Sequence, residues 1–161
     1  MTSHRILNIA TPLMALLIMA MAWSCTADTT YHKYVAVGEE GWSAHDTLVF
    51  DIDTLRTNGN FTTYVCLRAK PDFPYRYLSM IVEQTCMPSG NKERKTVRCE
   101  VVNSDGVMAG VGITYHTYEV PVFTGTHRPG EHIKVAIKHN MTREYMPGLM
   151  DVGVKLKVAT K

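Results

Sequence analysis

The sequence predicts an all-β fold, an antiparallel β-sandwich of the jelly-roll or Ig-like type. From residue 31 onward, apolar and polar side chains alternate with the two-residue period of β-strands, and no long stretch has helical periodicity. The alternating runs are short and are separated by clusters of Gly, Pro, Asn and Asp, which is typical of sandwiches and barrels. The chain of 161 residues is long enough for one such domain, and we expect a single sandwich over residues 31–161.

Each expected strand follows from the composition of its run. The strands are expected at residues 46–53, 61–69, 75–84, 95–102, 110–122, 132–139 and 151–159. The first two alternate apolar with polar side chains, the next three are rich in β-branched and aromatic residues, and the last two set Val, Ile and Leu against Lys. Turn signals at 57–60, 70–74, 103–106 and 128–130 separate these runs.

Residues 140–150 are the one stretch without a strand pattern. Thr142 is a suitable N-cap and Pro147-Gly148 would end a helix, so the sequence predicts a short helical turn near residues 142–147.

The N-terminus predicts a signal peptide over residues 1–24. A short segment with His4 and Arg5 is followed by an apolar run of roughly 15 residues, which is shorter than the about 20 that a membrane-spanning helix needs. The alternative, a buried amphipathic helix, is disfavoured because the run has no polar face.

Cys25 directly follows this run. Ala22-Trp23-Ser24-Cys25 resembles a bacterial lipobox, although Ala22 replaces the usual leucine; cleavage by an ordinary signal peptidase after Ala20-Met21-Ala22 is the alternative. We expect acylation of Cys25 to anchor the protein in a lipid bilayer, with residues 25–30 as a tether.

Three cysteines remain for the domain. Cys86 and Cys99 flank a predicted hairpin tip, and pairing Pro88 with Val97 would place the two opposite each other, so they are a candidate disulfide; two free thiols are the alternative. Cys66 is expected to be a small buried residue.

Composition and motifs argue against several functions. The formal net charge of +2 is too small to indicate a nucleic-acid partner. No catalytic, phosphate-binding or metal-ligand spacing is recognisable, so we expect no enzyme activity, cofactor or metal. Asp51 and Asp53 share a strand face and would support a cryptic hydrolase, but such pairs are usually a solvated surface.

Several segments together resemble the gliding-motility lipoproteins of the GldH type from Bacteroidetes. They are the lipobox cysteine, "GWSAHDTLVFDI", "CLRAKPDFPYRYLSM", "NSDGVMAGVGITYH" and, most specifically, "HNMTREYMPGLMDVGVKL". The chain departs from the family pattern at Tyr75-Arg76-Tyr77-Leu78 and at Ala22.

The resemblance implies a non-catalytic structural or assembly component of gliding-motility and linked protein-secretion machinery, with other envelope proteins as partners. The candidate docking surface comprises Met141, Arg143, Gly148, Leu149, Asp151, Val152 and Gly153. These residues could instead form a structural plug.

The alternative function is a lipid-anchored binding module for polysaccharide or another envelope ligand. Its candidate aromatic row is Tyr64, Tyr75, Tyr77, Tyr115 and Tyr118. Thr26 after the cysteine favours the outer membrane, and a tether whose only acid is Asp28 favours the periplasmic face.

Overall fold

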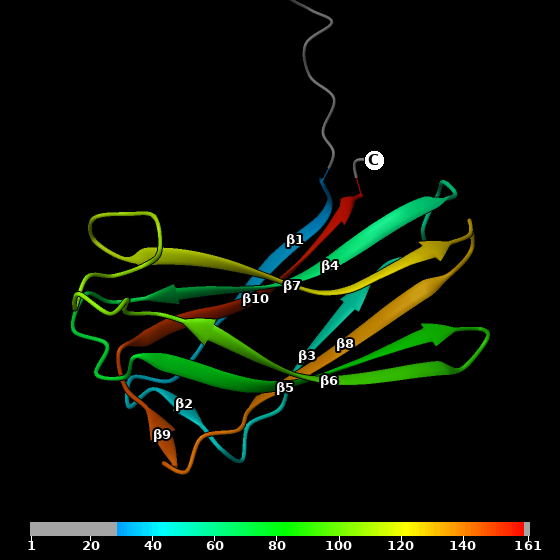
Figure 1. Cartoon of the computed structure of the whole chain (residues 1–161). Helices are drawn as coiled ribbons and strands as arrows, with labels where there is room; N and C mark the ends of the chain where they lie inside the picture. The colour runs from blue at the N-terminus through cyan, green and yellow to red at the C-terminus, as the bar shows by residue number, and fades with distance from the viewer. Residues whose placement is uncertain (1–28, 160–161) are drawn as a thin grey trace, which may run out of the picture.

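The computed structural model describes residues 29–159, and every regular element in that range is a β-strand (Figure 1). The strands are β1 (Thr29–Ala36), β2 (Trp42–Ser43), β3 (Leu48–Ile52), β4 (Gly59–Ala69), β5 (Tyr77–Met87), β6 (Asn91–Glu100), β7 (His116–His127), β8 (His132–His139), β9 (Tyr145–Met146) and β10 (Leu149–Val158). The all-β prediction is confirmed.

The predicted signal peptide and Cys25 lie outside the described residues. Strand β1 begins at Thr29, so the last two residues assigned to the tether belong to the first strand. Within residues 29–159 there is no helix of the length and apolarity needed to cross a bilayer.

Two four-stranded antiparallel sheets form the layers of a sandwich (Figure 1). One has the order β1-β10-β4-β7 and the other β3-β8-β5-β6. Among the eight long strands the first pairs with the last, the second with the seventh, the third with the sixth and the fourth with the fifth. This pairing of a long folded-over hairpin is the jelly-roll topology, one of the two sandwich types expected.

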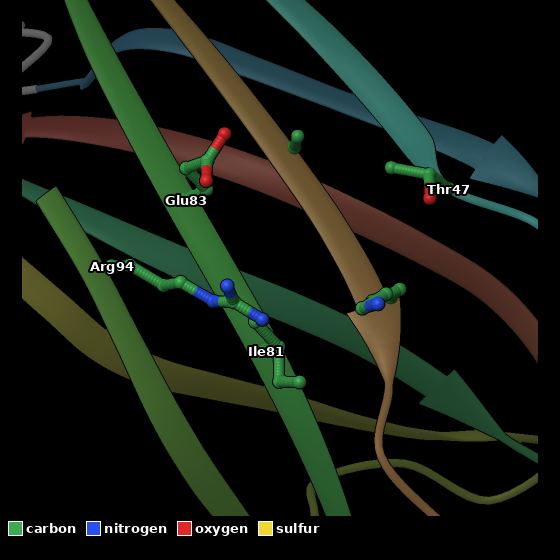
Figure 2. Close-up of a pocket in the computed structure, with 6 residues that line it drawn as sticks. Thr47, Ile81, Glu83 and Arg94 are labelled. Carbon is green, nitrogen blue, oxygen red and sulfur yellow. The ribbon is translucent and has the colours of Figure 1, made fainter. Parts of the chain in front are cut away.

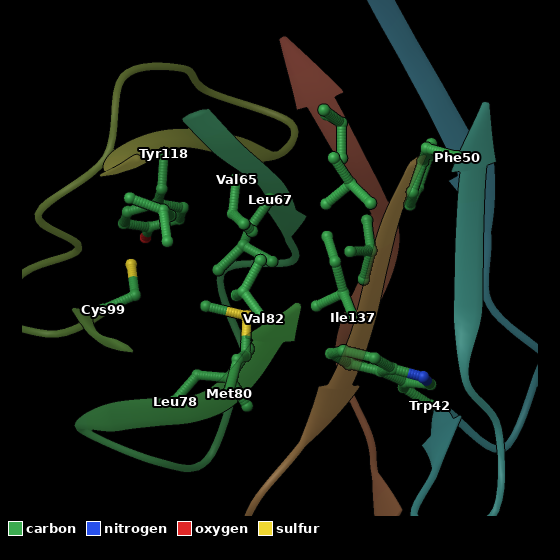
Figure 3. Packing of buried hydrophobic residues seen from close by; sticks show 14 of the residues in the cluster. Trp42, Phe50, Val65, Leu67, Leu78, Met80, Val82, Cys99, Tyr118 and Ile137 are labelled. Atoms are coloured by element: carbon green, nitrogen blue, oxygen red, sulfur yellow. The ribbon is translucent and has the colours of Figure 1, made fainter. Parts of the chain in front are cut away.

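The core lies between the sheets because alternate residues of each strand point inward (Figure 3). Trp42, Phe50 and Phe61 are its largest fully buried side chains. The Thr63 hydroxyl donates a 2.7 Å hydrogen bond to Oε1 of Gln84, which joins the two layers inside the core. Tyr118 of β7 links the sheets in the same way, because its hydroxyl donates to the carbonyl of Val101, the residue after β6, at 3.0 Å.

The helical turn predicted at residues 142–147 is wrong. Residues 142–144 bend, and Tyr145–Met146 form β9, which pairs with Trp42–Ser43 of β2. The Ala44 N–H donates to the Glu144 carbonyl at 2.7 Å, which continues the pairing. These backbone groups therefore bond to a segment far away in sequence, and the local hydrogen bonds of a helix do not form.

The disulfide predicted between Cys86 and Cys99 is also wrong. The chain reverses over residues 87–90, where the Gly90 N–H donates to the Cys86 carbonyl at 2.8 Å. In the resulting register Cys86 faces Asn91 and Cys99 faces Leu78, which is about 26 Å from Cys86 along the strand. Both cysteines are free thiols, and Cys99 is buried beside Tyr118 (Figure 3).

The two ends of the sandwich differ. At one end the start of β1 lies beside the end of β10, where Thr29 pairs with Lys157 (Figure 1). At the other end β4 finishes and β7 begins, and the long loop between β6 and β7 projects there. Val111 and Ile113 of that loop are 83% and 92% exposed.

Candidate functional site

The structure divides the seven predicted docking residues. Leu149 and Val152 are buried core residues, and Met141 packs partly buried against the core. Arg143 is exposed in the bend before β9. The buried members contribute packing of the kind that a structural plug requires.

Two glycines of the set are fixed by close backbone approaches. Gly148 has φ +80°, and a Cβ there would lie 3.0 Å from Cα of Phe73. Gly153 lies under the Tyr34 ring, where a Cβ would be 2.6 Å from the Lys33 carbonyl oxygen and 2.7 Å from Cδ1 of Tyr34. Only a residue without a side chain lets β1 and its tyrosine pack this closely on β10.

Asp151, the remaining member, belongs to a cluster on the outer face of the β1-β10-β4-β7 sheet. We call this cluster the Tyr34 face; it consists of Tyr34, Cys66, Arg68, Tyr115, Glu119, Asp151 and Lys155. Gly153 is what allows Tyr34 to lie across its centre.

Arg68 contacts three other residues of the Tyr34 face. Its guanidinium carbon lies 3.9 Å from the ring centroid of Tyr34 and 5.3 Å from that of Tyr115. Its Nη1 is 3.6 Å from a carboxylate oxygen of Asp151. A cation between two aromatic rings and a carboxylate is a well-compensated charge.

The rest of the Tyr34 face is equally compensated. Lys155 donates to Glu119 at 2.7 Å, and only 12% of the lysine side chain is exposed. Burial alone would lower the pKa of Lys155, but the hydrogen bond and charge of Glu119 raise it overall. Cys66 is fully buried beneath these side chains, as expected from the sequence.

The thiols of the domain are poorly suited to nucleophilic chemistry. Burial raises the pKa of Cys66 to about 12 and that of Cys99 to about 12, and it also raises the pKa of Cys86. The reactive form of a cysteine is the thiolate, which these environments disfavour at neutral pH.

The candidate carboxylate pair and a metal site find no geometric support. Asp51 and Asp53 are exposed, and Asp51 lies 3.6 Å from Nε2 of His132. Among residues 29–159 no group of three or more His, Cys, Asp or Glu side chains is arranged to hold a metal ion.

The five tyrosines of the candidate aromatic row do not form one. Tyr118 is buried and donates to the Val101 carbonyl. Tyr64 is on β4 and Tyr115 precedes β7. Tyr75 precedes β5 of the other sheet, and Tyr77 is the first residue of that strand. A flat aromatic platform of the kind that stacks on sugar rings is therefore not assembled from this set.

A second surface, which sequence reasoning missed, lies on the outer face of the β3-β8-β5-β6 sheet. We call it the cationic face; its defining residues are Arg94, Arg98, Lys134 and Lys138, all exposed. The alternation along β8 shows that its two lysines share one face. That the arginines of β6 lie on the same face, across β5, depends on the strand order of the sheet, which the sequence does not reveal.

A shallow depression of about 190 Å³ lies within the cationic face (Figure 2). Its two apolar lining residues are Ile81 and Ala136, and the rest of its lining is Thr47, Glu83, Arg94 and Lys138. Arg94 reaches from β6 across β5 toward Ile81 (Figure 2). The depression exists because a small residue on β8 lies between longer side chains.

The strand order defines a jelly-roll β-sandwich domain. Residues 29–159 contain no cluster of side chains arranged to hold a metal ion, and burial raises the pKa of Cys66 to about 12. The chain belongs to the GldH lipoprotein family, whose sequence profile matches residues 29–156, nearly the whole sandwich. The resemblance seen in the sequence is thereby confirmed.

The chain is similar to the gliding motility lipoprotein GldH of Flavobacterium johnsoniae, with 27% identity over 152 residues covering 88% of this chain and 92% of the relative. Among solved structures it is similar to a family 35 carbohydrate binding module from Clostridium thermocellum, with 12% identity, coverage of 79% and 99%, and a TM-score of 0.35. It is also similar to Eiger TNF from S. frugiperda, with 10% identity, coverage of 67% and 64%, and a TM-score of 0.29. The chain thus spans a little under two thirds of that last structure, and we draw no functional conclusion from either likeness.

Proposed function

We propose that this protein is a non-catalytic, lipid-anchored structural component of the envelope machinery for gliding motility and linked protein secretion. The observation that carries the proposal is the match of the GldH lipoprotein family to residues 29–156. The name of the Flavobacterium johnsoniae relative supports the connection to motility. Burial raises the pKa of Cys66 and of Cys99 to about 12, which disfavours catalysis by a cysteine nucleophile.

The proposed anchor is an acylated Cys25, and the proposed location is the periplasmic face of the outer membrane. Two or three acyl chains on one cysteine would hold the domain stably, whereas one chain binds only marginally. Thr26 and the single acid of the tether, Asp28, support this location. A Cys25→Ser variant should leave the membrane fraction and appear in the soluble periplasmic fraction; retention in the membrane would contradict the anchor.

Genetic complementation tests the role itself. A strain of Flavobacterium johnsoniae lacking its GldH relative should regain gliding or secretion when it expresses this chain, and should not regain it with Cys25→Ser. Failure of a stably expressed, membrane-bound wild-type chain to restore either process, while the strain's own gene does restore it, would count against the function.

Arg143 and Leu149 separate docking from packing in residues 139–156, the most specific segment of the family resemblance, which we call the signature segment. Arg143 is exposed, so Arg143→Ala should weaken partner co-purification with an unchanged melting temperature if this segment docks. Leu149 is only 3% exposed, so Leu149→Ala should cost about 2–4 kcal/mol of stability. Unchanged co-purification in Arg143→Ala would leave the segment with a packing role alone.

A further inference from the structure

The cationic face carries charges that the domain itself does not neutralise. Within residues 29–159, no carboxylate lies within ion-pair distance of Arg94, Arg98, Lys134 or Lys138. The three acids of this face have other partners: Glu83 pairs with Lys92 at 2.8 Å, Glu100 pairs with Arg76 at 3.3 Å, and Asp51 lies 3.6 Å from Nε2 of His132. Arg98 stacks on Tyr77, with 3.9 Å between the guanidinium carbon and the ring centroid, but this contact supplies no counter-charge.

The centre of the same face combines short or apolar side chains with one carboxylate. Val49, Ala136 and Glu83 lie side by side on three adjacent strands, and Val49 is 45% exposed. Ile81 lies beside Ala136 in the depression. Val49, Ile81 and Ala136 form a small apolar area that is bordered by the charged side chains of Glu83, Arg94 and Lys138. Apolar area bordered by polar groups is also the usual layout of a protein–protein interface.

We propose that the cationic face is a docking surface for an acidic face of another envelope protein. In this arrangement carboxylates of the partner meet Arg94, Arg98, Lys134 and Lys138, and an apolar side chain enters the depression over Ala136. The inference rests on the proposed function, because it assumes that Cys25 holds the domain at a membrane where such a partner resides.

The position of the anchor favours a protein over the bilayer as the occupant. Thr29 lies in β1, which belongs to the opposite sheet. Sheets pack about 10 Å apart, and outward side chains add about 5 Å more. The chain from Cys25 to Thr29 reaches at most about 14 Å when fully extended. A bilayer beneath the cationic face would therefore require this link to be stretched around the edge of the sandwich.

Cross-linking in the native envelope tests the proposal with the full-length chain. A photo-activatable amino acid replaces Val49, at the centre of the face, and the adduct is identified by mass spectrometry. We expect a discrete protein adduct that falls about tenfold in an Arg94→Glu, Lys138→Glu double variant, because two attractive charges become repulsive. The matched control is Lys70→Glu with Arg128→Glu, which reverses one exposed lysine and one exposed arginine away from the face.

Charge exchange gives the decisive confirmation. Once the cross-linked acidic residue of the partner is known, replacing it by lysine should restore the adduct of the double variant. An adduct that is absent, that contains only lipid, or that is equally strong in the double variant and the control would overturn the proposal. The double variant must retain the wild-type melting temperature, which its exposed positions favour.

Vesicle binding tests the bilayer directly. Full-length Cys25→Ser protein, which lacks the acyl anchor, is mixed with vesicles of phosphatidylethanolamine and phosphatidylglycerol. We expect no binding that depends on Arg94 and Lys138; such binding would assign the face to the membrane and overturn the proposal. A partner unrelated to motility or secretion would leave the docking surface standing and remove the proposed function, so the two failures are distinguishable.

Discussion

The outer faces of the two sheets carry the same residue types and use them in opposite ways. On the Tyr34 face, Arg68 pairs with Asp151 and stacks on Tyr34, and Lys155 donates to Glu119. On the cationic face, Arg98 also stacks on Tyr77, but within residues 29–159 no carboxylate lies in ion-pair distance of Arg94, Arg98, Lys134 or Lys138.

This difference separates side chains that hold the fold from those free to bind. A charge with its partner already in the same domain gains little by meeting another protein, because it must first break existing contacts. An unpaired cation on a rigid sheet loses less on binding and steers an acidic partner toward it. The Tyr34 face should therefore govern stability and the cationic face association.

Gly153→Ala should have the largest effect on stability. The new Cβ would lie 2.6 Å from the Lys33 carbonyl oxygen and 2.7 Å from Cδ1 of Tyr34, so β1 or its tyrosine must move. We expect a loss of about 2 kcal/mol in the free energy of unfolding, measured by chemical denaturation. Gly125→Ala is the control, because its Cβ would meet only Nε2 of His127 at 3.9 Å. Equal midpoints for the two variants would refute the tight packing.

Arginine–tyrosine coupling should differ between the faces, although the geometry matches. Arg68–Tyr34 and Arg98–Tyr77 both have 3.9 Å between the guanidinium carbon and the ring centroid. Double-mutant cycles with Arg→Met and Tyr→Leu should give about 1 kcal/mol for the half-buried Arg68 pair and about half of that for the exposed Arg98 pair. A larger coupling on the cationic face would reverse the assignment of roles.

Lowering the pH should reduce the stability of the fold through His139, which is buried between the two sheets. His139 is 4% exposed, and burial lowers its pKa below the ordinary value, partly offset by the backbone carbonyls of Glu144 and Trp42. The unfolded chain then binds a proton more readily than the folded one, so stability falls as pH drops from about 6.5 toward the lowered value.

One proton limits the slope of this loss to about 1.4 kcal/mol per pH unit. Denaturation midpoints across this range should decline more steeply for the wild type than for His139→Gln. Parallel curves for the two proteins would exclude His139 as the cause.

Removing charge from the cationic face should have the smallest effect. Lys134→Gln and Lys138→Gln should each change the free energy of unfolding by no more than about 0.5 kcal/mol, because neither side chain has a partner to lose. The contrasting variant is Lys155→Gln, which leaves Glu119 unpaired and should cost about 1 kcal/mol. A cost on the cationic face equal to that of Lys155→Gln would show that its charges stabilise the fold.

The sequence predicted most of the long strands, missed β1, and revealed little of how distant strands pair. Alternation located β3, β4, β8 and β10 because burial on one face of a strand is recorded in its own residues. The helical turn failed because Thr142 and Pro147 are local signals, whereas the backbone of β9 bonds to β2. The Cys86–Cys99 bridge failed because a shift in the position of the turn changes the register of the whole hairpin.

The candidate site was predictable only in part, for the same reason. The signature segment was found from sequence, and the structure explains Gly153 by Tyr34, which is contributed by the first strand. The cationic face was not found, because its four cations come from β6 and β8, which flank β5 in the sheet. Charge that is dispersed along a chain becomes a patch only through strand order.

The side-by-side pairing of Thr29 with Lys157 determines where a reporter can be attached. With Cys25 anchored as proposed, a fluorescent protein fused behind β10 would compete with the bilayer for the same space. The turn at residues 103–106 lies at the opposite end of the sandwich, and at Gly106 an added Cβ would meet no atom within 4 Å. An epitope inserted there would lie far from the proposed anchor and leave both sheet faces uncovered.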